Sequence, residues 1–425
     1  MTEDFLHYIW QFRNFDNSGL KAQTGESIEI IKPGDHNLNA GPDFFNSVLK
    51  IGETLWAGNV EIHINSSDWN KHNHSEDKAY NNVVLHVVYN DDCIIQRISG
   101  ETIPAIELKG RINPAVFSCY SELLKSTQWI SCSKNINDVD EFIVSNWLSR
   151  LLIERLERKA ETIINSLKLT NNNWQETFYH HLARNFGFQL NAEPFELMSK
   201  SLPLLYLIKH RDNLVQIEAM IFGQAGMLES IIEDEYSCHL QKEYNYLKYK
   251  YSLNPIDNHL WKFLRLRPVS FPTIRLSQFA NLICKWENLF VKILECNNLQ
   301  QYYDLFNVSS SDYWDTHFTF GKQSIFSKKA LGKSSVEGIL INTVVPFLFV
   351  YGIQKQEDKF KEKALELLET LQGEGNSIIR EWKKTGMKCD SAFRSQALLE
   401  LKLNYCDLKR CLKCSIGNSI LKRGI

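Results

Sequence analysis

Residues 41–89 constrain the fold of this 425-residue chain more than any other stretch. Three apolar runs with strand character lie within it, at 44–51, 55–64 and 83–89. Polar, turn-forming residues separate these runs at 52–53 and 65–82. The pattern predicts a sheet of antiparallel strands with a loop-rich insertion before the third strand.

Polar and apolar side chains alternate within the second run. Because successive side chains of a strand face opposite sides, we expect Glu61 and His63 to share one face of the sheet. Asp43 opens the preceding strand, and a hairpin register brings its carboxylate beside that of Glu61. Two adjacent carboxylates are what a hard cation such as Mg²⁺ or Mn²⁺ takes from a protein. The sequence therefore predicts a Mg²⁺ or Mn²⁺ site at Asp43 and Glu61.

The letters PD at 42–43, followed after a hairpin by EIH at 61–63, resemble the motif of the PD-(D/E)XK nuclease superfamily. The resemblance implies a restriction-endonuclease-like sheet domain in which Asp43 and Glu61 bind metal and the third position handles the attacking water. That position holds His63, where the superfamily has lysine, so a fixed positive charge is missing. A histidine can still carry a proton near neutral pH. Glu29 is a candidate for the further acidic residue that such nucleases often carry before the aspartate.

The loop between the second and third runs offers another constellation. His72 and His74 are separated by one residue, a spacing that suits zinc, and Asp68 and Asp77 lie nearby in the sequence. The text HNHSED at 72–77 is only loosely similar to the His-X-His-X-Asp-His motif of metallo-β-lactamase-type hydrolases. Two alternatives stay open, a polar loop that closes over the sheet and a loop that contacts substrate at the mouth of the carboxylate site. His86, within an apolar strand, is either a hydrogen-bonded core residue or a further member of the site.

From residue 115 onward the apolar side chains repeat with helical spacing, which predicts an all-helical domain over 119–372. Within it, a proline-broken loop carries Arg265, Arg267 and Arg275. Arginines in such a place are candidate phosphate contacts, and helix capping or pairing with acidic side chains is the alternative.

Four cysteines gather near the C-terminus with the spacing C-x16-C-x4-C-x2-C, at Cys389, Cys406, Cys411 and Cys414. The final C-x2-C suits tetrahedral Zn²⁺, and the other two cysteines would complete the shell. We predict a structural zinc site here, with free thiols and an iron–sulfur cluster as alternatives. The surrounding residues 373–425 carry 11 basic and 5 acidic side chains, against 9 and 16 in residues 1–118. A basic tail suits contact with phosphate.

The expected architecture is α+β in three parts, a mixed or antiparallel sheet domain at 1–118, a large all-helical domain at 119–372 and a helical, cysteine-rich tail at 373–425. The formal net charge of −2 gives no global basic field. The N-terminus starts acidic and does not look like a signal peptide, and the most apolar run, 338–353, is shorter than a membrane span. We therefore expect a cytoplasmic protein without a membrane partner, whose cysteines are reduced.

Segments along nearly the whole chain resemble one uncharacterised bacterial family, known as domain of unknown function 2851. They are AGPDFFNS, GNVEIHINSSDWNKHNHSEDKAYNNVVLHVVY, IPAIELK, FGQAGML, LRPVSFPTIRLSQFA, INTVVPFLFVYG and YCDLKRCLKCSIG. The family resemblance implies no activity of its own. From the candidate site, the leading hypothesis is a metal-dependent nuclease that hydrolyses phosphodiester bonds of DNA or RNA. The alternatives are a non-catalytic nucleic-acid or protein-binding module on a degenerate nuclease fold, and a zinc-dependent hydrolase that uses the histidine-rich loop.

Overall fold

The computed structural model describes residues 1–229 and 234–422, and the chain divides into two compact units. The first, which we call the sheet unit, consists of Met1–Trp147 and Leu401–Ile425, and the second, the helical unit, is Leu148–Glu400. This division differs from the three ranges expected. The first helices after the sheet belong to the sheet unit, and the C-terminal tail is shared between the two units.

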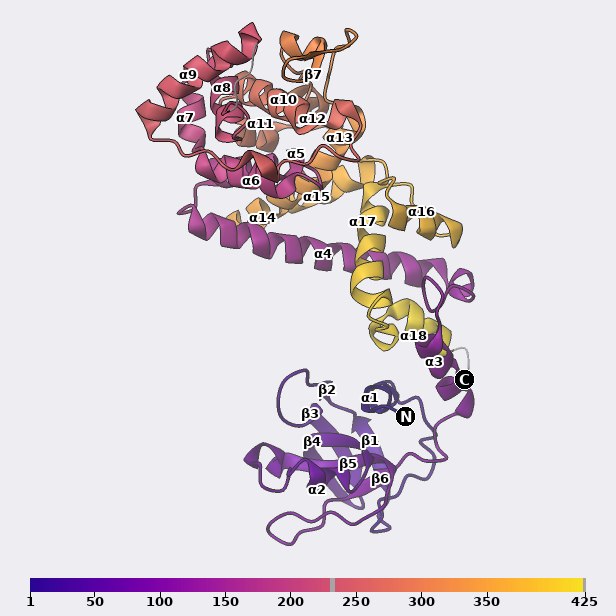
Figure 1. Cartoon of the computed structure of the whole chain (residues 1–425). Coiled ribbons are helices and arrows are strands. Elements are labelled where there is room, and N and C mark those ends of the chain that lie inside the picture. The colour runs from indigo at the N-terminus through magenta and orange to yellow at the C-terminus, as the bar shows by residue number, and fades with distance from the viewer. Residues whose placement is uncertain (230–233, 423–425) are drawn as a thin grey trace. The chain divides into compact units, whose positions relative to one another are not determined.

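The sheet unit contains one mixed sheet (Figure 1). Its strand order is β1-β3-β4-β5-β6, and β2 pairs with β3. The strands are β1 (Ile28–Lys32), β2 (Asp35–His36), β3 (Phe44–Ile51), β4 (Thr54–Asn65), β5 (Val83–Asn90) and β6 (Ala105–Glu107). β1, β3 and β4 are antiparallel, whereas β5 runs parallel to β4 and β6 parallel to β5. All three apolar runs are therefore strands, but the antiparallel orientation expected for the third run is wrong.

The connections explain this change of direction. β3 and β4 form a hairpin whose turn begins with Gly52 at a φ of +58°, a backbone conformation that tight hairpin turns require. β4 and β5 are joined instead by residues 66–82, which contain α2 (Asp68–Lys71) and η1 (Lys78–Asn82). A connection of this length can carry the chain back to the start of β4, which is what a parallel pair needs.

Both faces of the sheet are covered. One face packs on α1 (Glu3–Gln11), α3 (Pro114–Lys125) and α18 (Ser415–Lys422), which share a single core cluster with the strands. On the other face, residues of the 66–82 connection pack with a smaller cluster of Trp69, Val83, Ile95 and Ile103. The middle of β4 is consequently buried on both sides, and residues 60–63 are all buried. The polar members of this segment, Glu61 and His63, therefore lie between the sheet and the connection that covers it.

The helical unit contains most of the long α4, which begins in the sheet unit, and the helices that follow it (Figure 1). Its longer helices are α4 (Glu141–Leu169), α5 (Trp174–Phe186), α6 (Ala192–Ser201), α8 (Leu214–Gln224), α9 (Glu235–Tyr251), α10 (Pro272–Lys285), α14 (Val345–Lys355), α15 (Asp358–Thr370), α16 (Ser377–Lys384) and α17 (Ala392–Leu401). Shorter helices are α7 (Leu204–Ile208), α11 (Leu289–Glu295), α12 (Leu299–Leu305) and α13 (Lys333–Ile339). One small hairpin, β7 (His317–Thr319) with β8 (Lys322–Gln323), departs from the all-helical expectation.

One continuous helical stretch, Lys333–Lys355, is long and apolar enough to cross a membrane by length and composition. Within the helical unit, however, 72% of its most apolar window is buried. This burial is what a core helix of a water-soluble protein shows, because a helix that is apolar all round must be covered by protein or by lipid.

Candidate metal centre

Asp43 and Glu61 lie side by side where β3 begins. The Asp43 backbone N–H donates to Oε2 of Glu61 at 3.1 Å, and the Ile62 N–H donates to Oδ2 of Asp43 at 2.9 Å. Each carboxylate thus accepts a hydrogen bond from the strand that carries the other. The neighbouring pair Phe44 and Val60 is in register across the same two strands. The hairpin brings the two carboxylates together, as the sequence led us to expect.

Two imidazoles lie at the Glu61 carboxylate, and a third lies beside one of them. Oε1 of Glu61 lies 3.3 Å from Nε2 of His74 and 3.6 Å from Nε2 of His63. Nε2 of His63 lies 3.2 Å from Nδ1 of His72. One ligand atom from each of the three histidines lies within 4.8 Å of the other two. We call Glu61, His63, His72 and His74 the His–Glu cluster.

His86 orients His63 from the adjacent strand. It is in register with Glu61 across β4 and β5, and its Nε2 lies 2.9 Å from Nδ1 of His63. This contact occupies Nδ1 of His63, and therefore Nε2 is the nitrogen that faces the cluster. Ligating histidines are generally held through their second nitrogen in this way.

Aromatic side chains from the 66–82 connection pack against His74 and His86. The Trp69 ring packs edge-on against His74 and His86, at centroid distances of 5.4 and 5.3 Å. Its Nε1 donates to Oγ of Ser75 at 2.9 Å, and Tyr80 stacks on His74 at 3.8 Å. The connection is thus a packed structure that positions His72 and His74 over the strands.

A residue that the sequence did not single out, His7 of α1, completes the surroundings of Asp43. Its Nε2 lies 3.2 Å from Oδ2 of Asp43. His7 follows Glu3 and Asp4 by four and three residues in an amphipathic helix, a spacing that shares one helical face. The packing of α1 against the sheet shows that this face reaches Asp43.

Burial determines the charges of these groups. Desolvation, with the proximity of other imidazoles, lowers the pKa of His63 to about 2 and that of His86 to about 3. Desolvation, together with the charge of Asp43, raises the pKa of Glu61 to about 7. For His7, burial lowers the pKa but the hydrogen bond and charge of Asp43 raise it more, so the net shift is upward. The imidazoles of His63 and His86 are therefore neutral and keep a free lone pair for ligation.

Two buried imidazole nitrogens of this site face carboxylate oxygens. Nε2 of His7 lies 3.2 Å from Oδ2 of Asp43, and Nε2 of His74 lies 3.3 Å from Oε1 of Glu61. Nδ1 of His86 is buried and has no hydrogen-bond partner among the residues that the structure describes. An imidazole nitrogen beside a carboxylate oxygen is placed so that both atoms could bind one cation. The donor set of three imidazoles and one carboxylate suits Zn²⁺ or Mn²⁺ better than Mg²⁺, which prefers oxygen ligands. The residues present thus fit a transition-metal ion.

The site is open on one side. Glu61, His63 and His86 are buried, with 4%, 2% and 0% of their surface exposed. His72 is exposed, and the Asp43 side chain keeps 23% of its surface accessible. A ligand would therefore approach past His72 and Asp43.

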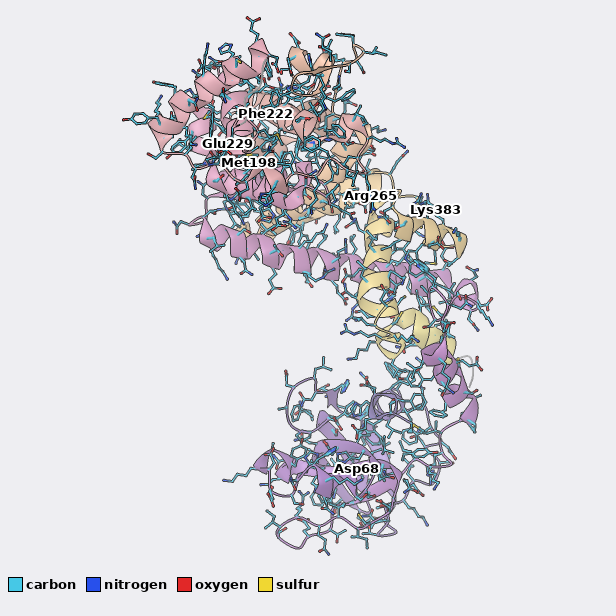
Figure 2. The ribbon with its side chains drawn as sticks, viewed as in Figure 1. Asp68, Met198, Phe222, Glu229, Arg265 and Lys383 are labelled. Carbon is cyan, nitrogen blue, oxygen red and sulfur yellow. The ribbon has the colours of Figure 1, made fainter. Side chains whose placement is uncertain are left out.

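The other acidic candidates lie elsewhere in the sheet unit. Asp68 accepts from the Asn65 N–H at 2.9 Å and pairs with Lys71 at 2.6 Å, so it stabilises the start of the connection (Figure 2). Asp77 caps η1 by accepting from the Ala79 N–H at 2.9 Å. Glu29 is exposed on β1, where it pairs with a residue near the far end of β3 from Asp43. The expectation that Glu29 joins the carboxylate site is wrong.

The three candidate arginines, Arg265, Arg267 and Arg275, belong to the helical unit, whereas the His–Glu cluster belongs to the sheet unit. Arg265, labelled in Figure 2, and Arg267 are exposed. Arg275 is buried, donates to Gln278 at 3.1 Å and to Ser335 at 2.9 Å, and lies over the Phe188 ring at 4.8 Å. Its guanidinium is engaged in packing, which does not fit the expected phosphate contact.

The expected set of four cysteines is not one cluster. Cys389 lies in the helical unit, where its thiol donates to the Met387 carbonyl at 3.4 Å. Cys406, Cys411 and Cys414 lie in the sheet unit. The spacing along the chain was therefore misleading for Cys389.

The comparison with known proteins gives one match. The family model described as "Protein of unknown function (DUF2851)" matches residues 3–377, a range that includes His7, Asp43, His86 and the whole His–Glu cluster. No curated protein and no solved structure matches the chain.

Proposed function

The chain belongs to the family described as protein of unknown function DUF2851, and we propose that it is a metal-dependent hydrolase that cleaves phosphodiester bonds of DNA or RNA at the His–Glu cluster. The observation that carries this proposal is a group of three imidazoles whose ligand atoms lie close together, two of them at the Glu61 carboxylate and beside a second carboxylate, Asp43. Such a set of donors, partly open to solvent, is what a catalytic metal site requires.

The cluster supplies the ligands. Glu61 and the facing nitrogens of His63, His72 and His74 would hold a Zn²⁺ or Mn²⁺ ion. The bound ion would supply Lewis acidity, polarising a phosphoryl oxygen and acidifying a water. The upward pKa shift of Glu61 agrees with this role, because a bound cation would favour the charged form of a carboxylate that burial and the nearby Asp43 disfavour.

The likeness of residues 42–43 and 61–63 to the PD-(D/E)XK motif is the reason for proposing a phosphodiester as the substrate. In the structure, β1, β3 and β4 are antiparallel, and a connection with short helices leads to the parallel β5. Asp43 directly precedes the second of these three strands, and Glu61 lies within the third, the positions that the motif occupies in that superfamily.

The surroundings change the role proposed for His63. Its Nδ1 is engaged by His86 and its Nε2 faces the cluster, so it serves as a ligand and not as the carrier of a proton. The pair of His7 and Asp43, at the open side of the site, is better placed to exchange a proton with the attacking water.

The test uses the full-length chain, stripped of metal and reloaded with Zn²⁺, Mn²⁺ or Mg²⁺. Labelled single-stranded DNA, duplex DNA and RNA are the substrates, and EDTA is the blank. We expect cleavage with a transition metal, and a loss of roughly 100-fold or more in Glu61→Gln and His72→Ala. Glu29→Gln, which changes an exposed glutamate on the same sheet, is the matched control and should cleave normally. Equal cleavage by all variants would overturn the assignment.

A non-catalytic binding module is the competing function. The motif position that holds a charged lysine in the nuclease superfamily holds the neutral His63 in this chain. Binding of nucleic acid in a gel shift, without cleavage in any metal, would favour it. Retained cleavage in Asp43→Asn, with loss in His72→Ala, would instead favour a zinc hydrolase that does not use the carboxylate pair.

A further inference from the structure

We propose that Cys132, Cys406, Cys411 and Cys414 form a second metal site, a structural zinc site with four thiolate ligands that fastens the C-terminal segment to the sheet unit. The site is independent of the His–Glu cluster and of the activity proposed there. It replaces the expected Cys389 by Cys132, a residue more than 250 positions away from the other three in the sequence.

The four thiols lie within electrostatic range of one another. Cys406 interacts with each of the other three. Cys132 interacts with Cys411 and Cys414, which also interact with each other. Cys389 has Lys383, Asp390 and Arg394 as its neighbours and none of these thiols. Proximity in the fold thus selects a different quartet from the one that spacing suggested.

The backbone around Cys411 and Cys414 has the form of a metal-binding turn. The Cys414 N–H donates to the Cys411 carbonyl at 3.3 Å across η8 (Cys411–Lys413), and α18 begins directly afterwards. A Cβ on Gly417 would stand 2.2 Å from the Cys411 oxygen, so only glycine permits this close approach. The N–H groups of Ile416 and Gly417 donate to the Cys414 sulfur. Amide donors of this kind stabilise a thiolate.

Cys132 and Cys406 are held against this turn from two sides. The Asn135 and Ile136 amides both donate to the Cys132 carbonyl at 3.0 Å, and the side chain of Ser131 hydrogen-bonds the Cys411 thiol. Cys406 ends the π-helical turn η7 (Lys402–Cys406). Just beyond it, Lys409 Nζ donates to the Ser126 carbonyl at 3.0 Å, which ties the segment to the end of α3.

The chemistry of the donors points to zinc. Cys414 is buried and the other three are partly buried, and no disulfide joins cysteines in the described part of the chain. Four thiolates in tetrahedral geometry are a standard shell for structural Zn²⁺, and they disfavour hard cations. Among the described residues, three ligand atoms lie within 4.8 Å of one another only at the histidines. The sulfurs must therefore close in by side-chain rotation to reach a Zn–S distance of about 2.3 Å.

The test is metal analysis of the full-length protein and its Co²⁺-substituted form. We expect tightly bound zinc and, with Co²⁺, the intense thiolate-to-cobalt charge-transfer absorption that histidine and carboxylate ligands do not give. Cys132→Ser should lose that absorption and one equivalent of zinc, whereas the matched control Cys389→Ser should keep both. Normal zinc in Cys132→Ser, or loss of it in Cys389→Ser, would overturn the proposal.

A further variant separates ligand loss from misfolding. Cys132→His retains a nitrogen ligand that zinc accepts, so we expect one bound zinc and a charge-transfer intensity reduced by about a quarter, as one of four sulfurs is replaced. Unchanged intensity would exclude Cys132 from the shell. Iron with acid-labile sulfide, in place of zinc, would also overturn the assignment.

Discussion

His63 and His86 form a buried pair of neutral imidazoles between β4 and β5, and their titration should make the sheet unit sensitive to acid. Their folded pKa values, about 2 and 3, lie below the ordinary value of 6.5. Below pH 6.5 the unfolded chain therefore binds more protons than the folded one, and the free energy of unfolding falls as the pH decreases. Each histidine contributes about 1.4 kcal/mol per pH unit at most. Glu61 titrates in the opposite sense, because its raised pKa favours the folded state in acid.

We expect His86→Phe to remove one of the two histidine contributions, so that the sheet unit loses less stability between pH 6.5 and 4.5 than the wild type does. The measurement is hydrogen exchange of β4 and β5 amides in EDTA, corrected for the intrinsic rate at each pH. His239→Gln, at a side chain that is 60% exposed in the helical unit, is the control and should follow the wild type. The same pH slope in His86→Phe and wild type would contradict the pKa shifts.

At the scale of single residues, the sequence identified the groups that share a local pattern and missed those that the fold assembles. Asp43, Glu61 and His63 could be found because strand alternation and a hairpin fix their neighbours. His72 and His74 could be proposed from their spacing, and one alternative placed their loop at the mouth of the Asp43 and Glu61 site, but only the fold gives their contacts there. His7 and Cys132 lie on other elements, which the sequence alone does not bring to these sites. Cys389 shows the converse error, since nearness in sequence did not bring its thiol to the other three.

At the scale of elements, packing between α8 and α9 depends on a glycine. A Cβ on Gly223 would stand 2.2 Å from the ring of Tyr244, which is buried. We expect Gly223→Ala to destabilise the helical unit by about 1–3 kcal/mol, because the ring must move out of a packed interior. Gly338→Ala, in α13, meets its nearest atom at 3.7 Å. It should be neutral or stabilise by roughly 0.5–1 kcal/mol through helix propensity.

Urea unfolding followed by far-ultraviolet circular dichroism, which reports mainly the helices, distinguishes the two glycine variants. If the urea midpoint of Gly223→Ala equalled that of Gly338→Ala, α8 and α9 could move apart without a loss of stability. That result would contradict the close approach of Gly223 to Tyr244 in the structure.

The elements themselves were largely predictable. The three strands of residues 41–89 begin and end within about one residue of the apolar runs, since side-chain alternation and turn residues are local signals. The direction of β5 was not predictable in this way. A connection of this length can either close a hairpin or cross over at the free edge of β4, and the packing of residues 66–82 against the sheet, which is not a local signal, distinguishes the two.

At the scale of the whole molecule, the last helix, α18, stabilises the sheet unit, which is formed mainly by the N-terminal part of the chain. Leu421 of α18 is fully buried in the core cluster that α1, α3 and the sheet share, although nearly 300 residues separate it from α3. The helical unit has its own buried interior. A defect at the C-terminus should therefore weaken the sheet unit and spare the unit that lies between the two parts in the sequence.

We expect Leu421→Ala to lower the stability of the sheet unit by about 2–4 kcal/mol, the usual cost of a cavity at a buried leucine. Hydrogen exchange of β3, β4 and β5 amides should accelerate accordingly, whereas α8 and α10 amides should exchange as in the wild type. Lys422→Ala, at the exposed neighbouring position, should change neither. Faster exchange in the helical unit as well would mean that the two units unfold together. In that case the covalent connection at residue 401, where the chain re-enters the sheet unit, would couple the stabilities of the two units although each has its own core.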